Sequence, residues 1–127
     1  MKRGDIVIIA AKGEYTGKPR PALVVQSDLF AETASVTLCL MTTDLIDAPL
    51  IRIDVDPSDQ NGLRVKSQIM VDKILTVHRD RIAKTVGAMD DATILRVDRS
   101  LVVFLGIIKP PSRRPVARKA RSRGRKR

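Results

Sequence analysis

Residues 18–28 read KPRPALVVQSD. Within them, the run PALVVQS at 21–27 is short and apolar and contains two adjacent valines, which predicts a strand. It follows KGEYTGKP at 12–19, where two glycines and a proline predict a loop. DIVIIA at 5–10 is another short apolar run. This part of the chain therefore predicts two strands joined by a loop.

Three more strands are predicted downstream. SVTLCLMT at 35–42 is mostly apolar, LIRIDV at 50–55 alternates like a half-buried strand, and SQIMVDKI at 67–74 is again apolar. The last two runs are separated by the turn cluster DPSDQNGLR, which contains Asn61-Gly62, a pair favoured in tight hairpin turns.

One helix is predicted, at residues 91–105. Asp90 or Asp91 can cap its N-terminus, and Gly106 can end it. The apolar face is formed by residues three and four apart and is widened by two neighbours: Ile94, Val97, Leu101 and Leu105, with Leu95 and Val102. The side chains expected to face water are Arg96, Asp98 and Arg99.

The fold class is predicted as mainly β with a C-terminal helix. TVHRDRIAKTVG at 76–87 leaves its own structure open, with a short helical turn at 79–81 followed by a strand as one interpretation. Five or six short strands and one late helix indicate a small, strongly curved antiparallel sheet with the helix packed on it. Aromatic residues make up only 2% of the chain, so the core must be aliphatic.

The net charge of +10 is concentrated in a tail. Of the 24 Lys and Arg residues, ten lie in 109–127, where there is no acid, so residues 1–108 carry 14 bases and 14 acids. The tail has almost no apolar residue and cannot offset its ordering entropy by burial, so it is expected to be disordered. The expected organisation is one domain over 1–108 and a basic tail over 109–127.

Several function classes find little support in the sequence. With a single cysteine, Cys39 in an apolar run, the chain has no intrachain disulfide, and a buried thiol is expected. His78 is the single histidine, so a metal cluster is not expected, and a surface turn is preferred for it over a catalytic role. No glycine-rich phosphate loop and no signal or membrane segment is found, so a cytoplasmic protein without cofactor or membrane association is expected.

Polar residues at strand ends are the candidates for chemistry. Arg20 lies where the loop meets the strand, Thr42 and Thr43 end the run at 35–42, and Asp72 stands among apolar neighbours. For each residue alone, a structural role is the preferred interpretation.

Together, these segments resemble the MazF/PemK toxins. The resemblance covers residues 1–108 and rests on five segments in order: RGDI (3–6), KPRPALVVQSD (18–28), MTT (41–43), VDKI with TVHRDRI (71–82), and a helix with RVD (96–98) and LG (105–106). It implies an SH3-like, partly closed barrel with a C-terminal helix, the CcdB/PemK-like toxin fold. It also implies a homodimer that binds single-stranded RNA in an interface groove, and a cognate antitoxin that occupies this groove.

The resemblance also implies a sequence-specific endoribonuclease that needs no metal. RNA carries its own nucleophile, the ribose 2′-OH, so a protein need only remove its proton, neutralise the phosphate and protonate the leaving oxygen, which yields a 2′,3′-cyclic phosphate. By resemblance, Arg20 binds the phosphate, Thr42 donates a hydroxyl to it, and Asp72 is the candidate general base. The further residues expected to contact RNA are Glu14, Lys18, Thr43 and Lys73.

This chain departs from the family pattern at three points. The loop before Arg20 is short, and only Gly13-Glu14 resembles the usual signature there. Lys73 stands where a Gln is usual, and Met70 stands where some members have an Arg, which leaves the general acid unassigned. Two alternatives stay open: a non-catalytic barrel of the same fold that binds a protein target, as the gyrase poisons do, and a small RNA-binding protein.

Deleting residues 109–127 is predicted to weaken RNA affinity and flatten its salt dependence, while the dimer and the cleavage site stay unchanged. Phosphate contacts release counterions, so each lost Lys or Arg contact lowers the slope of log affinity against log salt. Full-length and truncated protein, both carrying Arg20→Ala to prevent turnover, are titrated against one RNA at several salt concentrations. Identical slopes would leave the tail with no role in RNA binding.

Overall fold

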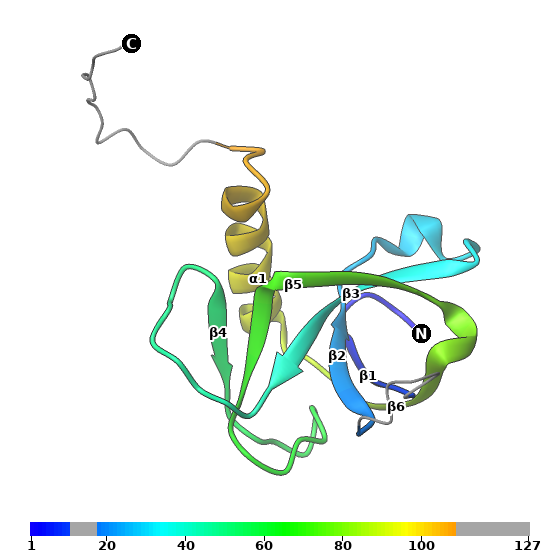
Figure 1. The fold of residues 1–127 in the computed structure, drawn as a ribbon, viewed down its shortest axis with the longest axis horizontal. Coiled ribbons are helices and arrows are strands. Elements are labelled where there is room, and N and C mark those ends of the chain that lie inside the picture. Colours follow the sequence, from blue (N-terminus) through cyan, green and yellow to red (C-terminus); the bar gives the residue numbers. More distant parts are fainter. Residues whose placement is uncertain (11–17, 109–127) are drawn as a thin grey trace.

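Six strands form one antiparallel sheet, and a single α-helix packs on it, in a computed structural model that describes residues 1–10 and 18–108 (Figure 1). The elements are β1 (Asp5–Ile9), β2 (Arg20–Val24), β3 (Ser35–Thr42), β4 (Arg52–Val55), β5 (Ser67–His78), β6 (Ile82–Ala88) and α1 (Asp91–Phe104), with short 3₁₀ turns at Asp28–Phe30 and Arg79–Arg81. The strand order is β4-β5-β3-β2-β1-β6. The sheet curves strongly, but β4 and β6 are its two edges, so the described strands do not close into a barrel.

The predicted strands are confirmed, with shifted boundaries. β3 has the predicted bounds, whereas β2 ends at Val24 because Ser27 caps the 3₁₀ turn that follows. The segment 76–87 does contain a helical turn followed by a strand, as one interpretation had it. The prediction that a strand ends at residue 74 was wrong, because β5 continues through twelve residues to His78 by pairing with β3.

β5 carries a large bulge opposite β3. Between Cys39 and Met41, β3 contributes one residue, whereas β5 contributes four, residues 70–73. Extra residues on one strand bend it and increase its twist. β5 bends sharply along its length (Figure 1), and Asp72 lies within the bulge.

The core lies on both faces of the sheet, because alternate residues point to opposite sides. One cluster, which packs against α1, consists of Ile6, Leu23, Cys39, Met41, Ile53, Val55, Ile69, Val71, Met89 and Val97. The second consists of Val7, Ile9, Ala22, Val24, Val36, Leu38 and Val77. All of these side chains are aliphatic or sulfur-containing, as the low aromatic content predicts.

Helix α1 stands against β4 and β5 (Figure 1). The side chain of Asp90 accepts a hydrogen bond from the backbone N–H of Thr93 and so caps the helix, and Gly106, at a φ of 72°, follows its end. The apolar face is narrower than predicted. Val97 is fully buried, but Leu95 and Leu105 are at least half exposed.

The sequence predicted that Asp98 faces water, but its side chain forms an ion pair with Arg3. Nη2 of Arg3 donates to Oδ1 of Asp98 at 2.7 Å, and Nε of Arg3 donates to the carbonyl of Val25 at 2.7 Å. Arg3 therefore ties the N-terminal RGDI segment to β2 and to the RVD segment of the helix. The backbone of Gly4 adds hydrogen bonds to Val24 and Met89.

The connection between β4 and β5 is a long loop, not the tight hairpin that Asn61-Gly62 suggested. The buried Asn61 side chain holds the loop through the backbone of Asp56, Ser58 and Leu63. Gly62 has a φ of 70°, which favours glycine. The loop lies directly against β6, because a Cβ added to Gly87 would overlap the backbone of Asn61.

Glu14 and the tail 109–127 lie outside the described residues. The predictions for these parts of the chain therefore stay predictions.

Gly87→Ala is predicted to lower the free energy of unfolding by about 3 kcal/mol, near the upper end for forcing an atom into a packed space. Gly106→Ala is the matched control. A Cβ there meets nothing within 4 Å, so only the positive φ is strained, at a cost of about 1 kcal/mol. Urea unfolding of both variants measures the difference, and equal losses would contradict the close packing at Gly87.

Candidate active site

Arg20 and Thr42 lie at the same end of two neighbouring strands. β2 begins at Arg20 and β3 ends at Thr42, and the two strands pair antiparallel with Ala22 facing Leu40. Arg20 and Thr42 each lie two residues beyond this last pair, so by strand alternation their side chains are on the same face as Ala22 and Leu40. Facing residues on neighbouring strands have side chains on the same face of the sheet. The structure therefore brings together two candidates that are far apart in the sequence.

The two side chains are accessible to a ligand. Arg20 is exposed, and Thr42 is half-buried, with Oγ1 accepting a hydrogen bond of 3.0 Å from the backbone N–H of Asp44. The hydroxyl proton of Thr42 stays available as a donor. Lys18 and Thr43, which the sequence predicted to contact RNA, are exposed beside them.

The row continues across the sheet through two residues that the sequence did not single out. Gln68 on β5 faces Thr42 on β3, and Asp54 on β4 faces Gln68 from the other side. We call these four residues on four adjacent strands, Arg20, Thr42, Gln68 and Asp54, the polar row. The opposite face at this end is occupied by the apolar cluster that contains Met41, Ile53 and Ile69.

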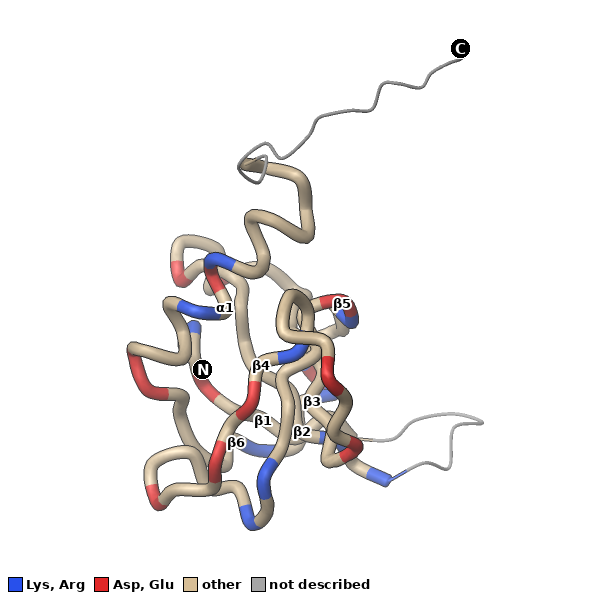
Figure 2. Tube along the Cα trace, turned by 90° about the vertical axis from the view of Figure 1, so that its left-hand side faces the viewer, with Lys and Arg blue, Asp and Glu red and all other residues tan. Residues whose placement is uncertain are grey.

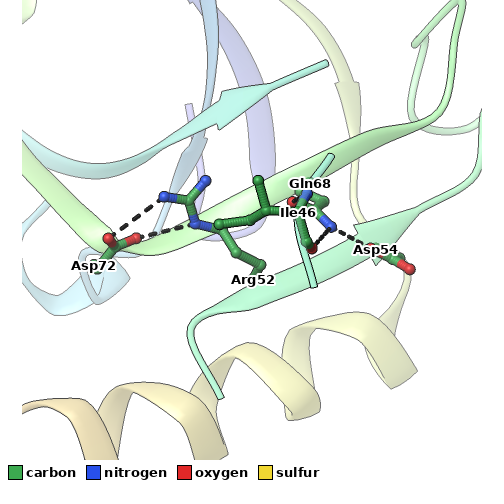
Figure 3. A network of polar contacts seen from close by, with 5 residues as sticks. All are labelled: Ile46, Arg52, Asp54, Gln68 and Asp72. Atoms are coloured by element: carbon green, nitrogen blue, oxygen red, sulfur yellow. Dashed lines mark hydrogen bonds and ion pairs between the residues drawn. The ribbon is translucent and has the colours of Figure 1, made fainter. Parts of the chain in front are cut away.

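Gln68 is buried, and its amide is fully hydrogen-bonded (Figure 3). Oε1 accepts from the backbone N–H of Ile46 at 3.2 Å. Nε2 donates to the carbonyl of Ile46 at 2.9 Å and to Oδ1 of Asp54 at 2.8 Å. Gln68 thus fastens the connection that follows Thr42, residues 43–51, to the sheet.

Asp72, the candidate general base, is bound to Arg52 rather than to the Arg20–Thr42 pair (Figure 3). Nε of Arg52 lies 3.3 Å from Oδ1 of Asp72, and Nη2 of Arg52 lies 3.5 Å from Oδ2. The geometry at Oδ1 is not that of a hydrogen bond. Oδ1 of Asp72 and Nε of Arg52 are buried without a hydrogen-bond partner among the described residues. The guanidinium of Arg52 therefore holds the carboxylate of Asp72 in a partly buried ion pair.

Sequence reasoning missed Gln68 and Arg52. The available signal was the alternation of LIRIDV, which places Arg52 and Asp54 on one face of their strand. Their partners on β5 come from pairing between distant segments. Lys73, which the sequence predicted to contact RNA, is exposed in the β5 bulge next to Asp72.

Two other residues are where the sequence predicted them. His78 is exposed and caps the 3₁₀ turn, with its Nδ1 3.0 Å from Oδ1 of Asp80. It therefore lies in a surface turn, as the sequence predicted. Cys39 is completely buried, and burial raises the pKa of its thiol to about 11. A thiol in this state is not a nucleophile near neutral pH.

The described part of the chain offers little for other chemistries. Within residues 1–10 and 18–108, no group of three or more His, Cys, Asp and Glu residues is arranged to hold a metal ion. No helix in these ranges is long and apolar enough to cross a membrane. Acidic and basic residues are interspersed over the fold (Figure 2).

The chain is similar to known toxins along most of its length. Residues 2–105 match the family of PemK-like, MazF-like toxins of type II toxin–antitoxin systems. A probable endoribonuclease MazF of Mycolicibacterium smegmatis is 50% identical over 107 residues, covering 84% of this chain and 98% of the relative. Endoribonuclease EndoA of Bacillus subtilis is 29% identical over 115 residues, covering 85% and 97%.

The fold is similar to that of solved toxin structures. An endoribonuclease in complex with its cognate antitoxin from a mycobacterial species superposes with a TM-score of 0.71 at 23% identity, covering 87% of this chain and 99% of that one. The chain belongs to the PemK-like, MazF-like toxins of type II toxin–antitoxin systems.

Proposed function

We propose that this chain is the toxin of a toxin–antitoxin pair and cuts single-stranded RNA at internal bonds without a metal ion. The observation that carries the proposal is the placement of Arg20 and Thr42 at the same end of the paired strands β2 and β3 and on the same face of the sheet. Family membership supports the same activity, because relatives at 50% and 29% identity are named endoribonucleases. The two alternatives, a protein-binding poison and a simple RNA-binding protein, have no comparable support.

Arg20 and Thr42 are proposed to bind the scissile phosphate. A guanidinium is always charged and can donate two parallel hydrogen bonds to phosphate oxygens. The hydroxyl of Thr42, on the same face, can donate a third. As the 2′-oxygen attacks, negative charge builds up on the phosphorus-bound oxygens, and donors already in place stabilise that charge without having to reorganise.

Asp72 is the proposed general base, acting on the 2′-OH. Its support is its position in the segment VDKI, which resembles the family, and the guanidinium of Arg52, which orients the carboxylate. In this reaction the 2′-oxygen forms a bond to phosphorus as its proton passes to Asp72. The bond from phosphorus to the 5′-oxygen breaks, and this oxygen leaves on the downstream product and takes up a proton from a donor that is not assigned to a residue. A 2′,3′-cyclic phosphate remains on the upstream product.

A homodimer and an antitoxin are proposed as the partners. One solved structure of the same fold is an endoribonuclease in complex with its cognate antitoxin. Large apolar side chains are exposed in the connection 43–51 and at or just after the end of α1 in this chain: Leu45, Ile46, Leu50, Phe104, Leu105, Ile107 and Ile108. Exposed apolar surface of this kind is typical of protein interfaces.

Cleavage is predicted to continue in EDTA and to require a single strand. In-line attack by the 2′-oxygen needs a backbone that is free to rotate, which a duplex restricts. Labelled single-stranded RNA and the same RNA annealed to its complement are incubated with the purified protein and EDTA. Loss of cleavage in EDTA that magnesium restores would contradict the metal-free mechanism, and equal cutting of the duplex would contradict the single-strand requirement.

Arg20→Ala is predicted to slow cleavage by about 100-fold or more, the scale of losing one charge-stabilising donor. Arg20→Lys should restore little of the rate, because a point charge cannot reproduce the two-pronged hydrogen bonding of a guanidinium. Single-turnover rates on one RNA measure both effects.

The matched control is Lys84→Ala, which removes one exposed positive charge from the edge strand β6. It should cut at the wild-type rate. A wild-type rate for Arg20→Ala would remove Arg20 from the active site, and circular dichroism melting curves verify that all three variants are folded.

A further inference from the structure

A polar pocket lies beside the polar row, at the edge of the sheet. The connection 43–51 leads from β3 to β4, but β5 lies between these strands, so the connection crosses β5. Between this connection, strands β4 and β5 and helix α1 is a pocket of about 120 Å³. Ile46 and Pro49 form part of its wall, and the buried Gln68 holds the connection in place through the backbone of Ile46.

The charged side chains around this pocket have both signs. Asp47 and Asp54 supply acceptors, and Arg52 and Arg96 supply donors. Arg52 is already paired with Asp72, and Asp54 accepts from Gln68. Asp47 and Arg96 are exposed at the pocket, so they can turn toward a ligand.

This mixture of charges does not suit a phosphate. Two carboxylates beside a bound phosphate would repel it, whereas the phosphate sites of proteins gather positive charge. The edge of a nucleobase presents N–H donors next to carbonyl or ring-nitrogen acceptors, and side chains of both kinds can read it. In single-stranded RNA these edges are free, and the bases can be turned out into pockets.

The pocket is within reach of an RNA strand bound at Arg20 and Thr42. Thr42, Gln68 and Asp54 face one another on adjacent strands. Neighbouring strands lie about 4.8 Å apart, so Thr42 and Asp54 are separated by about 10 Å. A nucleotide close to the cleaved bond can therefore place its base beside Asp54.

We propose that this pocket is a nucleobase subsite that reads one base near the cleaved bond, with Asp47 and Arg96 as the residues that determine its specificity. The inference rests on the proposed ribonuclease function and adds the site at which sequence is read. Asp47 accepts from the donor groups of the base, and Arg96 donates to its acceptors.

The test compares Arg96→Ala and Asp47→Asn with wild type on a random-sequence RNA pool, with the cut ends mapped by sequencing. Arg99→Ala is the matched control, because it removes the same charge from an exposed position of the same helix and does not line the pocket. In both pocket variants, the base preference at one and the same position near the cut should fall by about 10-fold, the scale of losing one base-edge contact. Arg99→Ala should give the wild-type profile.

An unchanged profile in both pocket variants would overturn the inference. So would a slower rate at all sequences without a change of preference, which is the signature of a phosphate contact. If wild type cuts no RNA, the proposed function fails, and affinity selection from the same pool still tests the subsite. In this selection every protein carries Arg20→Ala, and the RNA sequences bound with the wild-type pocket are compared with those bound by the Arg96→Ala pocket. A difference at one position would support the subsite, and identical sequences would overturn it.

Discussion

The crossing of residues 43–51 over β5 is the constraint on which the rest of the site depends. β3 and β4 are consecutive in the chain, yet β5 pairs with both of them, so the connection cannot remain in the plane of the sheet. Backbone groups that leave the sheet need new partners, because an unpaired buried N–H or carbonyl is costly. The side chain of Gln68 supplies these partners at Ile46, on both the N–H and the carbonyl. One buried amide thus fixes the loop that begins directly after Thr42.

The arrangement of β5 separates two kinds of function along one strand. Before the bulge, Gln68 belongs to the polar row and supports the end of β3. Within the bulge, Asp72 turns toward Arg52 on β4, away from regular pairing with β3. Bulges of this kind redirect side chains at functional sites. The residue proposed as the base and the two residues proposed to bind the phosphate therefore come from the same small sheet without lying in one row.

The apolar core fills both sides of the sheet but leaves polar side chains at the end where β2 begins and β3 ends. The cluster beneath α1 and the second cluster account for the aliphatic residues of β1, β2 and β3. At the ends of β2 and β3 the alternation continues, but the side chains on one face become polar. A rigid, aliphatic sheet that carries its reactive groups at strand ends holds them more precisely than a loop would.

The sequence by itself determined the elements and the partition of charge. The run SVTLCLMT predicted β3 with its correct bounds, the periodicity of 91–105 predicted α1, and the charge count separated the tail from a neutral domain. Segments in family order were sufficient to identify the family. These features are local, because they follow from side-chain periodicity and composition over short windows.

Only the tertiary structure decided which strands are neighbours and what their side chains contact. The insertion of β5 between β3 and β4, the pairing of Arg52 with Asp72 and the hydrogen bonds from Gln68 to Ile46 all join segments that are distant in the sequence. The same holds for the pairing with β3, which extends β5 to His78 where a local pattern ended it at residue 74. Strand order and register are set by the packing of the whole sheet, and a period of two residues along one strand carries no information about its partner.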